Sequence, residues 1–583
     1  MPRRSPSPPI SLIPIIPPIS LIPLLLCTLL LTQLNAQSVP SNAGKLIHSK
    51  SGMVVSASPE ASAVGATVLR SGGNAVDAAV AVGFALAVTY PSAGNIGGGC
   101  YIIIRMADGR ESAIDARETA PAAAHRDMYL TAGGEVNSEA SLYGPLAAGV
   151  PGSVDGLLLA LDTYGSKSRE ELLHPAISLA KDGFPLHPRL AKGFQIYEKE
   201  FKRYPSTFQI FAPDGRLPKK SDIWRQPELA ETLQRISDAG RDGFYAGETA
   251  RRFAKAMQQD GGIITEKDLA EYHAIERRPL HGKYMRYDIL SMPPSSSGGL
   301  ALLQMLGIIE RSPARSNPQR DPKSAHFIIE AMRRAFADRA MYLGDPAFVD
   351  IPLQHLLSPD YLDTLYASID PAAATPSSSI RKSLLPANEG TNTTHYSIID
   401  RWGNAVSVTT TINSTYGSKY VVPGCGFMLN NEMDDFSASP GTPNQFGLLG
   451  NESNSIQPGK RMLSSMTPTI VMEGDTVRMV LGSPGGSRII TTVLQVLLNV
   501  FAFNMPLDRA VAQPRFHHQW YPDMVYTEDD AFTPQTNTEL QSMGYRIRSD
   551  VDFGRVDAIM RGVDGLLHGC SDHRGFGAAH PSD

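Results

Sequence analysis

The chain has 583 residues, of which 42% are hydrophobic and 19% are charged. This composition is typical of a globular protein and excludes a disordered or fibrous one. The formal net charge is −5 at pH 7, and Lys and Arg are scattered along the sequence, which excludes the electrostatic pattern of a nucleic-acid-binding protein. The chain is long for one compact core, so we expect either two closely packed lobes or one large layered domain.

The first 36 residues differ in character from the rest of the chain. A basic start, MPRR, precedes the apolar run ISLIPIIPPISLIPLLLCTLLLT, and QLNA precedes Gln37. This order predicts a secretory signal peptide over residues 1–36, and therefore a periplasmic or secreted protein. The run is also long enough to span a bilayer, but its prolines would break such a helix, so we favour removal over a retained membrane anchor. Lipid attachment at Cys27 is a third option.

Three cysteines remain once the signal is removed, namely Cys100, Cys425 and Cys570. They are an odd number and lie far apart, so they cannot form a disulfide framework. The fold must therefore be stabilised by packing.

The first predicted elements cover residues 52–106 in the order strand, helix, helix, strand. Ser58-Pro59 is a typical helix start and Gly72-Gly73 a typical stop. Alanine and glycine dominate both helices, which suits helices packed closely against a sheet. Helical patterning is then expected from about Ser153 to Leu343. An irregular region follows, and it ends in the linker PAAATPSSSIRKSLLPANEG.

From Thr393 onward the pattern changes to strands. They are predicted at THYSII, AVSVTTTIN, TPTIVM, TVRMVLG, RVDAIMRG and GLLHGCS. Helices are predicted between them at SRIITTVLQVLLNVF and TPQTNTELQSMG. Helices and strands in both halves of the chain indicate one sheet-centred α/β architecture.

The first two of these strands form a predicted hairpin around the loop DRWGN. If Ile399 faces Ala405, then Thr393 faces Thr411, and Asn413 lies on the same face of the sheet. A slip of one residue would undo this arrangement. Threonine is common in strands, so ordinary cross-strand hydroxyl pairs are the structural alternative.

A chemical interpretation of Thr393 starts from its hydroxyl group. A threonine hydroxyl is a poor nucleophile without a base, but a threonine at a chain terminus carries one in its own α-amine, whose pKa is about 7.7 to 8. Thr393 is internal, so the bond between Asn392 and Thr393 would first have to be cut. The hydroxyl could attack its own preceding carbonyl and give an ester that water opens. Thr411 would then orient the hydroxyl of Thr393.

The segment LGSPGGSRII predicts a strand, a glycine turn and a helix, an arrangement that directs free backbone N–H groups at an anion. A phosphate site is one interpretation, but no lysine follows the glycines. We therefore favour an oxyanion hole formed by the amides of Gly485 and Gly486, where a Cβ atom would block close approach.

Three carboxylates, Glu432, Asp434 and Asp435, precede a long Gly/Pro/Asn-rich loop. They could be solvated or capping groups, metal ligands, or partners for an ammonium group. The hydroxyls of Ser464 and Ser465 could cap a turn or bind a carboxylate. The local sequence does not decide between these alternatives.

Two other positions are ambiguous. Arg117 follows a strand and could pair with Asp115 or Glu118 as a structural group. His517 and His518 suggest a metal site, but adjacent side chains point apart in regular structure and no further ligand follows at a suitable spacing. Structural roles are therefore favoured for both histidines.

Five motifs occur in a fixed order after the linker: TTHYS, NNEMDDFS, LSSMTPTIV, GSPGGSRI and PRFHHQW. Together with NAVDAAVAVGFALAVTYPSAGNIGGG in the first half, they resemble the γ-glutamyltransferase family over nearly the whole chain after the signal. The resemblance implies a four-layer αββα sandwich of the N-terminal nucleophile hydrolase type. It also implies self-cleavage into a large subunit, 37–392, and a small subunit, 393–583, which stay together as one fold. No metal or organic cofactor is implied.

The resemblance also implies a role for each candidate site residue. Thr393 would attack the γ-carbonyl of glutathione or another γ-glutamyl compound, and water or an acceptor amino acid or peptide would take the glutamyl group. The implied binding groups are Arg117, Ser464 and Ser465 for the α-carboxylate, Asn413, Glu432 and Asp435 for the α-amine, and Gly485 and Gly486 for the oxyanion.

One position departs from the family pattern. Several bacterial relatives have a tyrosine in the loop that covers the site, whereas PNQFG offers Phe446 here. Phenylalanine can cover a pocket but cannot donate that hydrogen bond, so gating and the balance of hydrolysis and transfer stay open. The alternatives to a γ-glutamyltransferase are an amidase for another acyl group, such as a glutaryl chain or poly-γ-glutamate, and an unprocessed anion-binding protein of the same fold.

Overall fold

This computed structural model describes residues 39–316, 320–380, 393–439 and 452–583. The predicted signal segment, Asn392 and Phe446 lie outside these residues. All described residues belong to one unit, Ser38–Asp583. None of the helices within these ranges is both long and apolar enough to cross a membrane.

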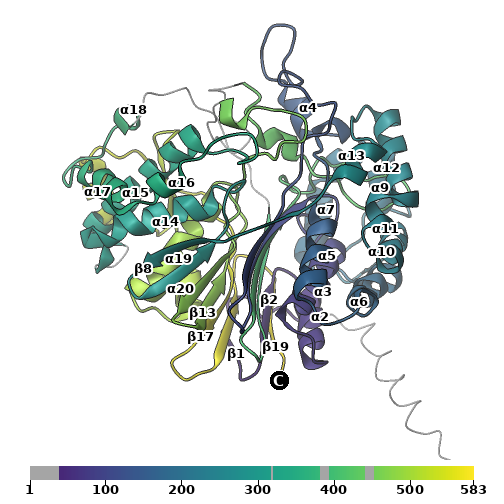
Figure 1. Ribbon diagram of the computed structural model, residues 1–583, viewed down its shortest axis with the longest axis horizontal. Coiled ribbons are helices and arrows are strands. Elements are labelled where there is room, and N and C mark those ends of the chain that lie inside the picture. The colour runs from purple at the N-terminus through teal and green to yellow at the C-terminus, as the bar shows by residue number, and fades with distance from the viewer. Residues whose placement is uncertain (1–38, 317–319, 381–392, 440–451) are drawn as a thin grey trace, which may run out of the picture. The chain divides into compact units, whose positions relative to one another are not determined.

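Two seven-stranded sheets form the centre of the described part of the chain, and every strand pair in them is antiparallel (Figure 1). The first sheet contains, in spatial order, β19 (Ala578–Pro581), β2 (Met53–Ser56), β10 (Thr394–Ile399), β11 (Ala405–Thr411), β3 (Gly99–Arg105), β4 (Glu111–Ala116) and β7 (Ile275–Arg277). The second contains β1 (Ile47–Ser49), β18 (Leu567–Ser571), β17 (Asp557–Arg561), β13 (Thr476–Leu481), β12 (Thr469–Glu473), β9 (Tyr287–Ser291) and β8 (Leu280–Tyr284).

Two small sheets lie outside this pair. Their strands are β14 (Phe516–His517), β15 (Val525–Thr527) and β16 (Ile547–Arg548) in one, and β5 (Phe184–Pro185) and β6 (Ile223–Trp224) in the other.

The predicted hairpin is confirmed with its register. Ile399 lies opposite Ala405, and the ladder continues to Thr394 opposite Thr410. Strand β10 also pairs with β2, and β11 pairs with β3, so the hairpin occupies the middle of the first sheet. Because its neighbours fix both strands, the residue just before β10 is held in a set position relative to the end of β11.

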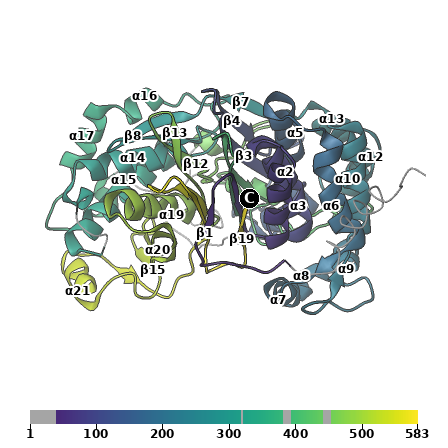
Figure 2. The same cartoon turned by 90° about the horizontal axis from the view of Figure 1, so that it is seen from below.

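Helices cover the outer face of the first sheet (Figure 2). Those against the sheet are α2 (Pro59–Arg70), α3 (Ala75–Thr89) and α5 (Ser153–Tyr164). Ser58 caps α2 with Pro59 in its first turn, as predicted. Every residue of α3 is buried, since further helices pack on its other side.

Further helices lie between β4 and β7 in the chain. They are α4 (Ser138–Leu142), α6 (Arg169–Asp182), α7 (Pro188–Ile196), α8 (Glu198–Phe201), α9 (Pro205–Phe211), α10 (Pro227–Ala239), α11 (Asp242–Tyr245), α12 (Gly247–Asp260) and α13 (Glu266–Glu271).

A second helical layer covers the outer face of the second sheet (Figure 1). Its main members are α14 (Gly298–Glu310), α15 (Pro322–Tyr342) and α19 (Arg488–Leu497), which continues into a π-helical turn, Leu498–Ala502. Shorter helices complete the layer, namely α16 (Leu353–Leu356), α17 (Pro359–Ala367), α18 (Ser377–Ile380), α20 (Leu507–Ala512) and α21 (Pro534–Ser542).

The alternation of side chains explains the four layers. In β3, Ile102 and Ile104 belong to the core beneath α2, α3 and α5, whereas Tyr101 and Ile103 face the second sheet. A strand buried on both faces contributes to two cores at once. The fold is therefore the predicted αββα sandwich, and segments on both sides of Thr393 supply strands to each sheet.

The prediction of helices from Ser153 to Leu343 is wrong in one part. Strands β7, β8 and β9 interrupt the helices, and β8 and β9 form a hairpin at the edge of the second sheet. Their two-residue turn contains Met285, with φ of 56°, and Arg286. Hairpin turns of this kind usually contain Gly, Asn or Asp, so the sequence carried no turn signal here.

Candidate active site

Thr393 lies directly before β10 and is only 5% exposed. Its Oγ donates a hydrogen bond to Oγ of Thr411, the last residue of β11, over 3.3 Å. The hydroxyl of Thr411 also accepts a hydrogen bond from the backbone N–H of Asn413 at 2.8 Å. The two threonines meet as the register predicted, and Thr411 can orient the hydroxyl of Thr393.

Both threonines line a pocket of about 310 Å³, counting the solvent at its mouth. The predicted site residues that line it with them are Arg117, Asn413, Glu432, Asp435, Ser464, Ser465 and Gly486. Four further residues complete the wall, namely Arg339, Leu463, Met466 and Ile489. Residues that are up to about 370 positions apart in the chain are thus brought to one place by the two sheets.

The guanidinium group of Arg117 lies at one end of the pocket. Its Nη1 is 2.6 Å from Glu432 and its Nη2 is 2.5 Å from Asp435, while Glu118 is more distant at 3.5 Å. Asp115 accepts a hydrogen bond from the backbone N–H of Arg117, whereas its ion pairs are with the side chains of Arg277 and Arg461. Arg117 is therefore not primarily the structural partner of Asp115.

The short 3₁₀ turn η4 (Glu432–Asp435) directs the three carboxylates of this segment in two directions. Side chains three residues apart lie above one another in a 3₁₀ helix, so Glu432 and Asp435 both reach Arg117. Asp434 points elsewhere and accepts a hydrogen bond from Ser141 at 2.7 Å. Asn413 is tied to the same segment, because its Nδ2 donates to the carbonyl of Asn431 at 3.0 Å.

Burial controls the ionisation of this cluster. It raises the pKa of Glu432 well above its usual range, and it raises that of Glu118 to about 7, although Arg117 opposes both shifts. Burial alone would lower the pKa of Arg117, but Glu432, Glu118 and Asp435 outweigh it and hold this pKa above its usual value. Arg117 is thus a permanent cation among carboxylates of unequal acidity.

Two serines and a second arginine form the wall next to this cluster. Ser464 and Ser465 are both buried, and the Oγ of Ser465 accepts from Nη2 of Arg339 at 3.5 Å. The carbonyl of Ser464 accepts from the backbone N–H and the hydroxyl of Ser297. Arg339 was not predicted, because it lies in the last turn of helix α15, a helix that also contains other arginines.

The glycine turn between β13 and α19 contains Gly486, which lines the same pocket as Thr393. Gly485 has φ of 132° and Gly486 has φ of 58°, which L-residues adopt only with strain. Neither backbone N–H has a hydrogen-bond acceptor among the described residues. Two free amides at a helix start can stabilise a developing negative charge.

The two glycines face different spaces. Gly486 lines the pocket of Thr393, whereas Gly485 lines a wider cleft of about 820 Å³, again counting open solvent, with Thr415, Phe553 and Arg555 among its other residues. Among the predicted site residues that the structure describes, Gly485 is therefore the one that does not line the pocket. The turn separates a narrow pocket from a wide opening.

The ring of His395 packs against the chain that enters this turn. Like Arg339, His395 was not singled out from the sequence. Its ring nitrogens bond to the hydroxyls of Thr409 and Ser397 at 2.9 and 3.0 Å. Burial lowers its pKa to about 3, so the ring is neutral. A Cβ atom on Gly482 would lie 2.3 Å from the ring, which shows how closely β10 packs against the chain entering the turn.

The adjacent histidines lie away from the pocket. His517 bonds to Thr491 at 2.8 Å and to Gln519 at 2.9 Å, and His518 lies 3.3 Å from Asp523. These partners agree with structural roles. Within the described ranges, no group of three or more His, Cys, Asp or Glu side chains is arranged to hold a metal ion. The three described cysteines are buried and unbonded to each other.

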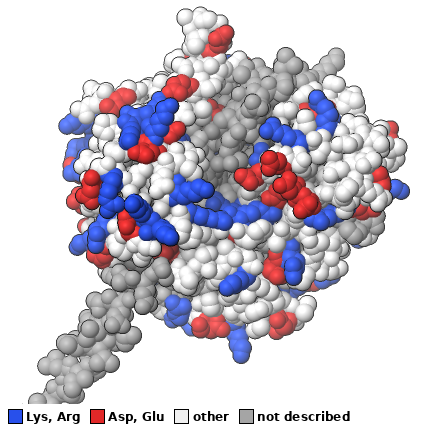
Figure 3. Space-filling model, turned by 180° about the vertical axis from the view of Figure 1, so that it is seen from behind, with Lys and Arg blue, Asp and Glu red and all other residues white. Residues whose placement is uncertain are grey.

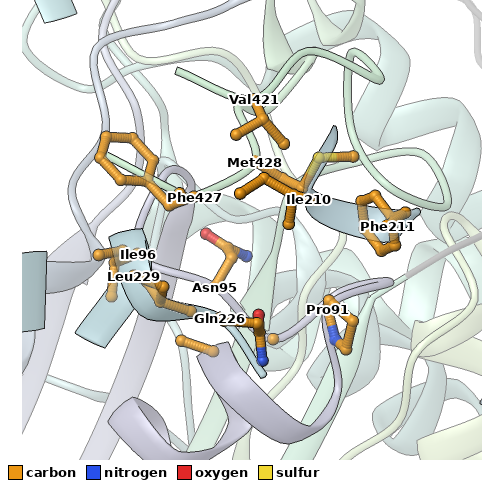
Figure 4. Close-up of a pocket in the computed structure, with 13 residues that line it drawn as sticks. Pro91, Asn95, Ile96, Ile210, Phe211, Gln226, Leu229, Val421, Phe427 and Met428 are labelled. Carbon is orange, nitrogen blue, oxygen red and sulfur yellow. The ribbon is translucent and has the colours of Figure 1, made fainter. Parts of the chain in front are cut away.

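Another cavity lies between helices α9 and α10 and the segment that follows β11 (Figure 4). It is lined mainly by apolar side chains, with Asn95 and Gln226 among them. Asn95 donates to the carbonyl of Thr411 at 3.2 Å, and Gln226 donates to that of Val88 at 2.9 Å. The two amides support the backbone rather than form a reactive centre.

On the face shown in Figure 3, Lys and Arg lie among Asp and Glu, so positive charge is not gathered into one extended patch. This pattern matches the scattered distribution in the sequence.

Comparisons with known proteins agree with this geometry. The family model described as Gamma-glutamyltranspeptidase matches residues 61–582. The glutathione hydrolase proenzyme of Escherichia coli (strain K12) is 45% identical over 529 residues, which cover 91% of each chain. The cephalosporin acylase from Bacillus halodurans has a TM-score of 0.80 at 27% identity, covering 92% of this chain and 97% of that one. The γ-glutamyltranspeptidase of Helicobacter pylori has a TM-score of 0.55 at 43% identity, covering 55% of this chain and 93% of that one.

Proposed function

We propose that this chain, which belongs to the γ-glutamyltranspeptidase family, transfers the γ-glutamyl group of glutathione or a related compound to water or to an acceptor amino acid or peptide. The single observation that carries this proposal is the hydroxyl of Thr393, held 3.3 Å from Thr411 in a pocket that also contains Arg117, Glu432 and Asp435. A nucleophile and a set of opposed charges in one small space suit a zwitterionic acyl donor.

In the proposed order of steps, self-cleavage of the chain precedes acyl transfer. The hydroxyl of Thr393 attacks the carbonyl of Asn392, the amide nitrogen leaves as the new α-amine, and water opens the resulting ester. The products are a large subunit, 37–392, and a small subunit, 393–583. The term proenzyme in the name of the Escherichia coli relative supports processing, and so does the Helicobacter pylori chain, which covers 55% of this chain but 93% of its own length.

Acyl transfer follows on the mature enzyme. The α-amine of Thr393 takes the proton of its own hydroxyl, whose oxygen attacks the γ-carbonyl of the donor. The amides of Gly485 and Gly486 stabilise the oxyanion, and the leaving amine takes up a proton as the acyl-enzyme forms. Water or an acceptor amine then attacks the ester and regenerates Thr393.

The charged end of the pocket holds the glutamyl head group. The α-ammonium group approaches Asp435, Glu432 and the amide of Asn413, and the α-carboxylate approaches Arg117 with the hydroxyls of Ser464 and Ser465. A donor that lacks the amine would lose its charge-assisted contact with Asp435, which would keep Arg117 as its cationic partner. The second candidate is an amidase for another acyl group, such as a glutaryl group, because the fold is similar to that of a cephalosporin acylase. Selectivity for the α-amine of the donor distinguishes the two candidates.

We also propose that residues 1–36 direct export and are removed, so that the mature enzyme works in the periplasm or outside the cell. The support is the basic start, the apolar run and the small residue before Gln37.

The assay uses purified, processed protein with glutathione as the donor, with and without a dipeptide acceptor. We expect release of glutamate without the acceptor and formation of a γ-glutamyl peptide with it. Glutaryl-4-nitroanilide, which differs from γ-glutamyl-4-nitroanilide only by the missing amine, is the matched control. Faster cleavage of the glutaryl donor would favour the amidase. If the purified chain is uncut and turns over neither donor, the anion-binding protein would be favoured.

A further inference from the structure

A second arginine shares the pocket with Thr393. Arg339 is on helix α15, is 5% exposed, and lines the pocket beside Ser465. It comes from the helical layer behind the second sheet, whereas Arg117 follows β4 of the first sheet. The two cations therefore enter the same space from different layers of the fold.

The partners of Arg339 are unusual for a buried arginine. Its Nε donates to the hydroxyl of Ser297 at 3.0 Å and its Nη2 to that of Ser465 at 3.5 Å. No carboxylate in the described ranges lies within 4.0 Å of its guanidinium group. Three other buried arginines have such a partner: Arg117 contacts Asp435, Arg334 contacts Glu330, and Arg515 contacts Asp572.

An arginine in this setting keeps its charge. Burial lowers the pKa of Arg339 to about 10, with Asp435 opposing the shift, so the side chain stays protonated near neutral pH. A buried cation without a counter-ion is destabilising, and proteins rarely retain one without a use for it. Because Arg339 has no carboxylate partner among the described residues, we expect an anionic ligand to bind beside it.

The charges of the pocket identify that ligand. Without substrate, Arg117 is already paired with Glu432 and Asp435, whereas the side-chain partners of Arg339 among the described residues are the hydroxyl groups of Ser297 and Ser465. Two arginines and two carboxylates match an amino-acid head group, whose ammonium group would take Asp435 as its partner and whose carboxylate needs a cation.

We propose that Arg339 binds the α-carboxylate of the γ-glutamyl donor, with the hydroxyl of Ser465 shared between the guanidinium group and that carboxylate. This inference rests on the proposed function, and it assigns to Arg339 part of the recognition that the sequence assigned to Arg117 alone. It also explains why Ser465 lies at hydrogen-bond distance from a cation that has no carboxylate of its own.

The structural alternative is that Arg339 only ties α15 to Ser297 at the start of α14. The two roles differ in which donor is affected. A binding residue matters for donors with an α-carboxylate, whereas a structural residue matters equally for all donors.

Three 4-nitroanilides test this difference with wild type and Arg339→Met. The γ-glutamyl donor has both charged groups, the glutaryl donor has only the carboxylate, and the 4-aminobutanoyl donor has only the amine. We expect Arg339→Met to lower kcat/KM by about 10- to 100-fold for the first two, mainly through KM, because a charge-assisted hydrogen bond is lost. The third should change less than twofold, and Arg339→Lys should recover part of the loss.

Ser297→Ala is the matched control, since it removes the Nε hydrogen bond but leaves the charge. It should alter the three donors equally, if at all. Each variant is first checked for two fragments on a denaturing gel, so that a folding defect is recognised. An equal loss for all three donors with Arg339→Met, or no loss for any, would overturn the inference.

Calorimetric binding of L-glutamate, glutarate and 4-aminobutanoate needs no turnover and separates this inference from the proposed function. We expect Arg339→Met to weaken glutamate and glutarate by about 10-fold or more but not 4-aminobutanoate. If wild type binds glutamate in this way but turns over no γ-glutamyl donor, the proposed function fails and the role of Arg339 stands. If Arg339→Met and wild type bind glutamate equally, the role of Arg339 fails and the reaction stands.

Discussion

The two ends of the pocket are built from different chemistry. At one end, the pocket is lined by the buried ionisable side chains of Arg117, Arg339, Glu432 and Asp435. At the other, the hydroxyls of Thr393 and Thr411 and the amides of the Gly485 turn are all uncharged before maturation. In the proposed reaction, charge would recognise the donor, whereas the reacting groups would act through their position.

The difference implies different kinetic signatures. Changes at the charged end should act mainly on KM, because those contacts exist both in the bound donor and in the transition state. Changes at the uncharged end should act mainly on kcat, because the hydroxyl and the amides contact charge that develops only during the reaction.

The largest effect is expected for Thr393→Ala. We expect a single full-length chain on a denaturing gel and no detectable γ-glutamyl transfer, since both the attacking oxygen and the processing step are lost. Thr394→Val is the matched control. The hydroxyl of Thr394 is buried and has no hydrogen-bond partner among the residues that the structure describes, so this neighbouring variant should be processed and active.

Gly485→Ala tests the turn. With φ of 132° at this position, a Cβ atom forces the backbone to move, and the two amides lose their direction. We expect kcat to fall by about 100- to 1000-fold, as for loss of an oxyanion donor, with KM changed by less than about threefold. Steady-state kinetics of the processed variant measure both. A rise in KM without a fall in kcat would place the oxyanion elsewhere.

Arg117→Lys tests the charged end. Lysine keeps the charge but cannot reach Glu432 and Asp435 with two nitrogens at 2.6 and 2.5 Å. We expect KM for the γ-glutamyl donor to rise by about 10-fold or more while kcat changes little. An unchanged KM would show that the head group binds in another place.

Thr411→Val removes the neutral hydrogen bond from the hydroxyl of Thr393, together with the one from the backbone N–H of Asn413. Such a bond contributes about 0.5 to 1.5 kcal/mol, so we expect kcat to fall by roughly 2- to 10-fold with KM unchanged. Thr411→Ser keeps the hydroxyl and should stay near wild type. Equal rates for the valine and serine variants would mean that Thr411 is only a strand residue.

His517 provides a reference outside both ends of the pocket. Burial lowers its folded-state pKa to about 3, against about 6.5 when unfolded. Between these values the unfolded chain binds a proton that the folded chain does not, so stability falls as pH falls from 6.5 toward 3, by up to about 1.4 kcal/mol per pH unit.

His517→Gln should remove this contribution, because glutamine does not titrate. Urea midpoints of the single-chain Thr393→Ala background, measured with and without His517→Gln, give the comparison. We expect a shallower loss of stability with acid in the double variant. Identical slopes would contradict a neutral buried ring at this position.

The sequence predicted the uncharged end well. Alternating residues around DRWGN determine the register of β10 and β11, and the register alone places Thr393 against Thr411. The glycine turn also has a local signature. Both features depend on residues close together in the chain, where backbone geometry limits the choices.

The charged end was predicted only in part. Resemblance pointed to Arg117 and to two of the three carboxylates, and the 3₁₀ geometry of η4 explains why Asp434 turns to Ser141 instead. Arg339 has no local signature in the sequence, because both it and Arg334 are arginines of the same helix. They differ in their contacts: Arg334 pairs with Glu330, whereas Arg339 donates to the hydroxyl of Ser465. Contacts between distant layers cannot be derived from spacing along one element.

The hairpin of β8 and β9 shows the same limit in the fold. Its turn uses Met285 and Arg286 without glycine or asparagine, so pairing with β12 rather than local turn chemistry determines it. Long-range pairing thus overrides the weak local pattern.

The central claim is that Thr393 becomes a chain terminus. Mass spectrometry and N-terminal sequencing of the purified active protein test it directly. We expect two chains, of which the smaller begins Thr-Thr-His-Tyr-Ser. An active protein whose smaller chain begins at any other residue, or that consists of one uncut chain, would contradict the account.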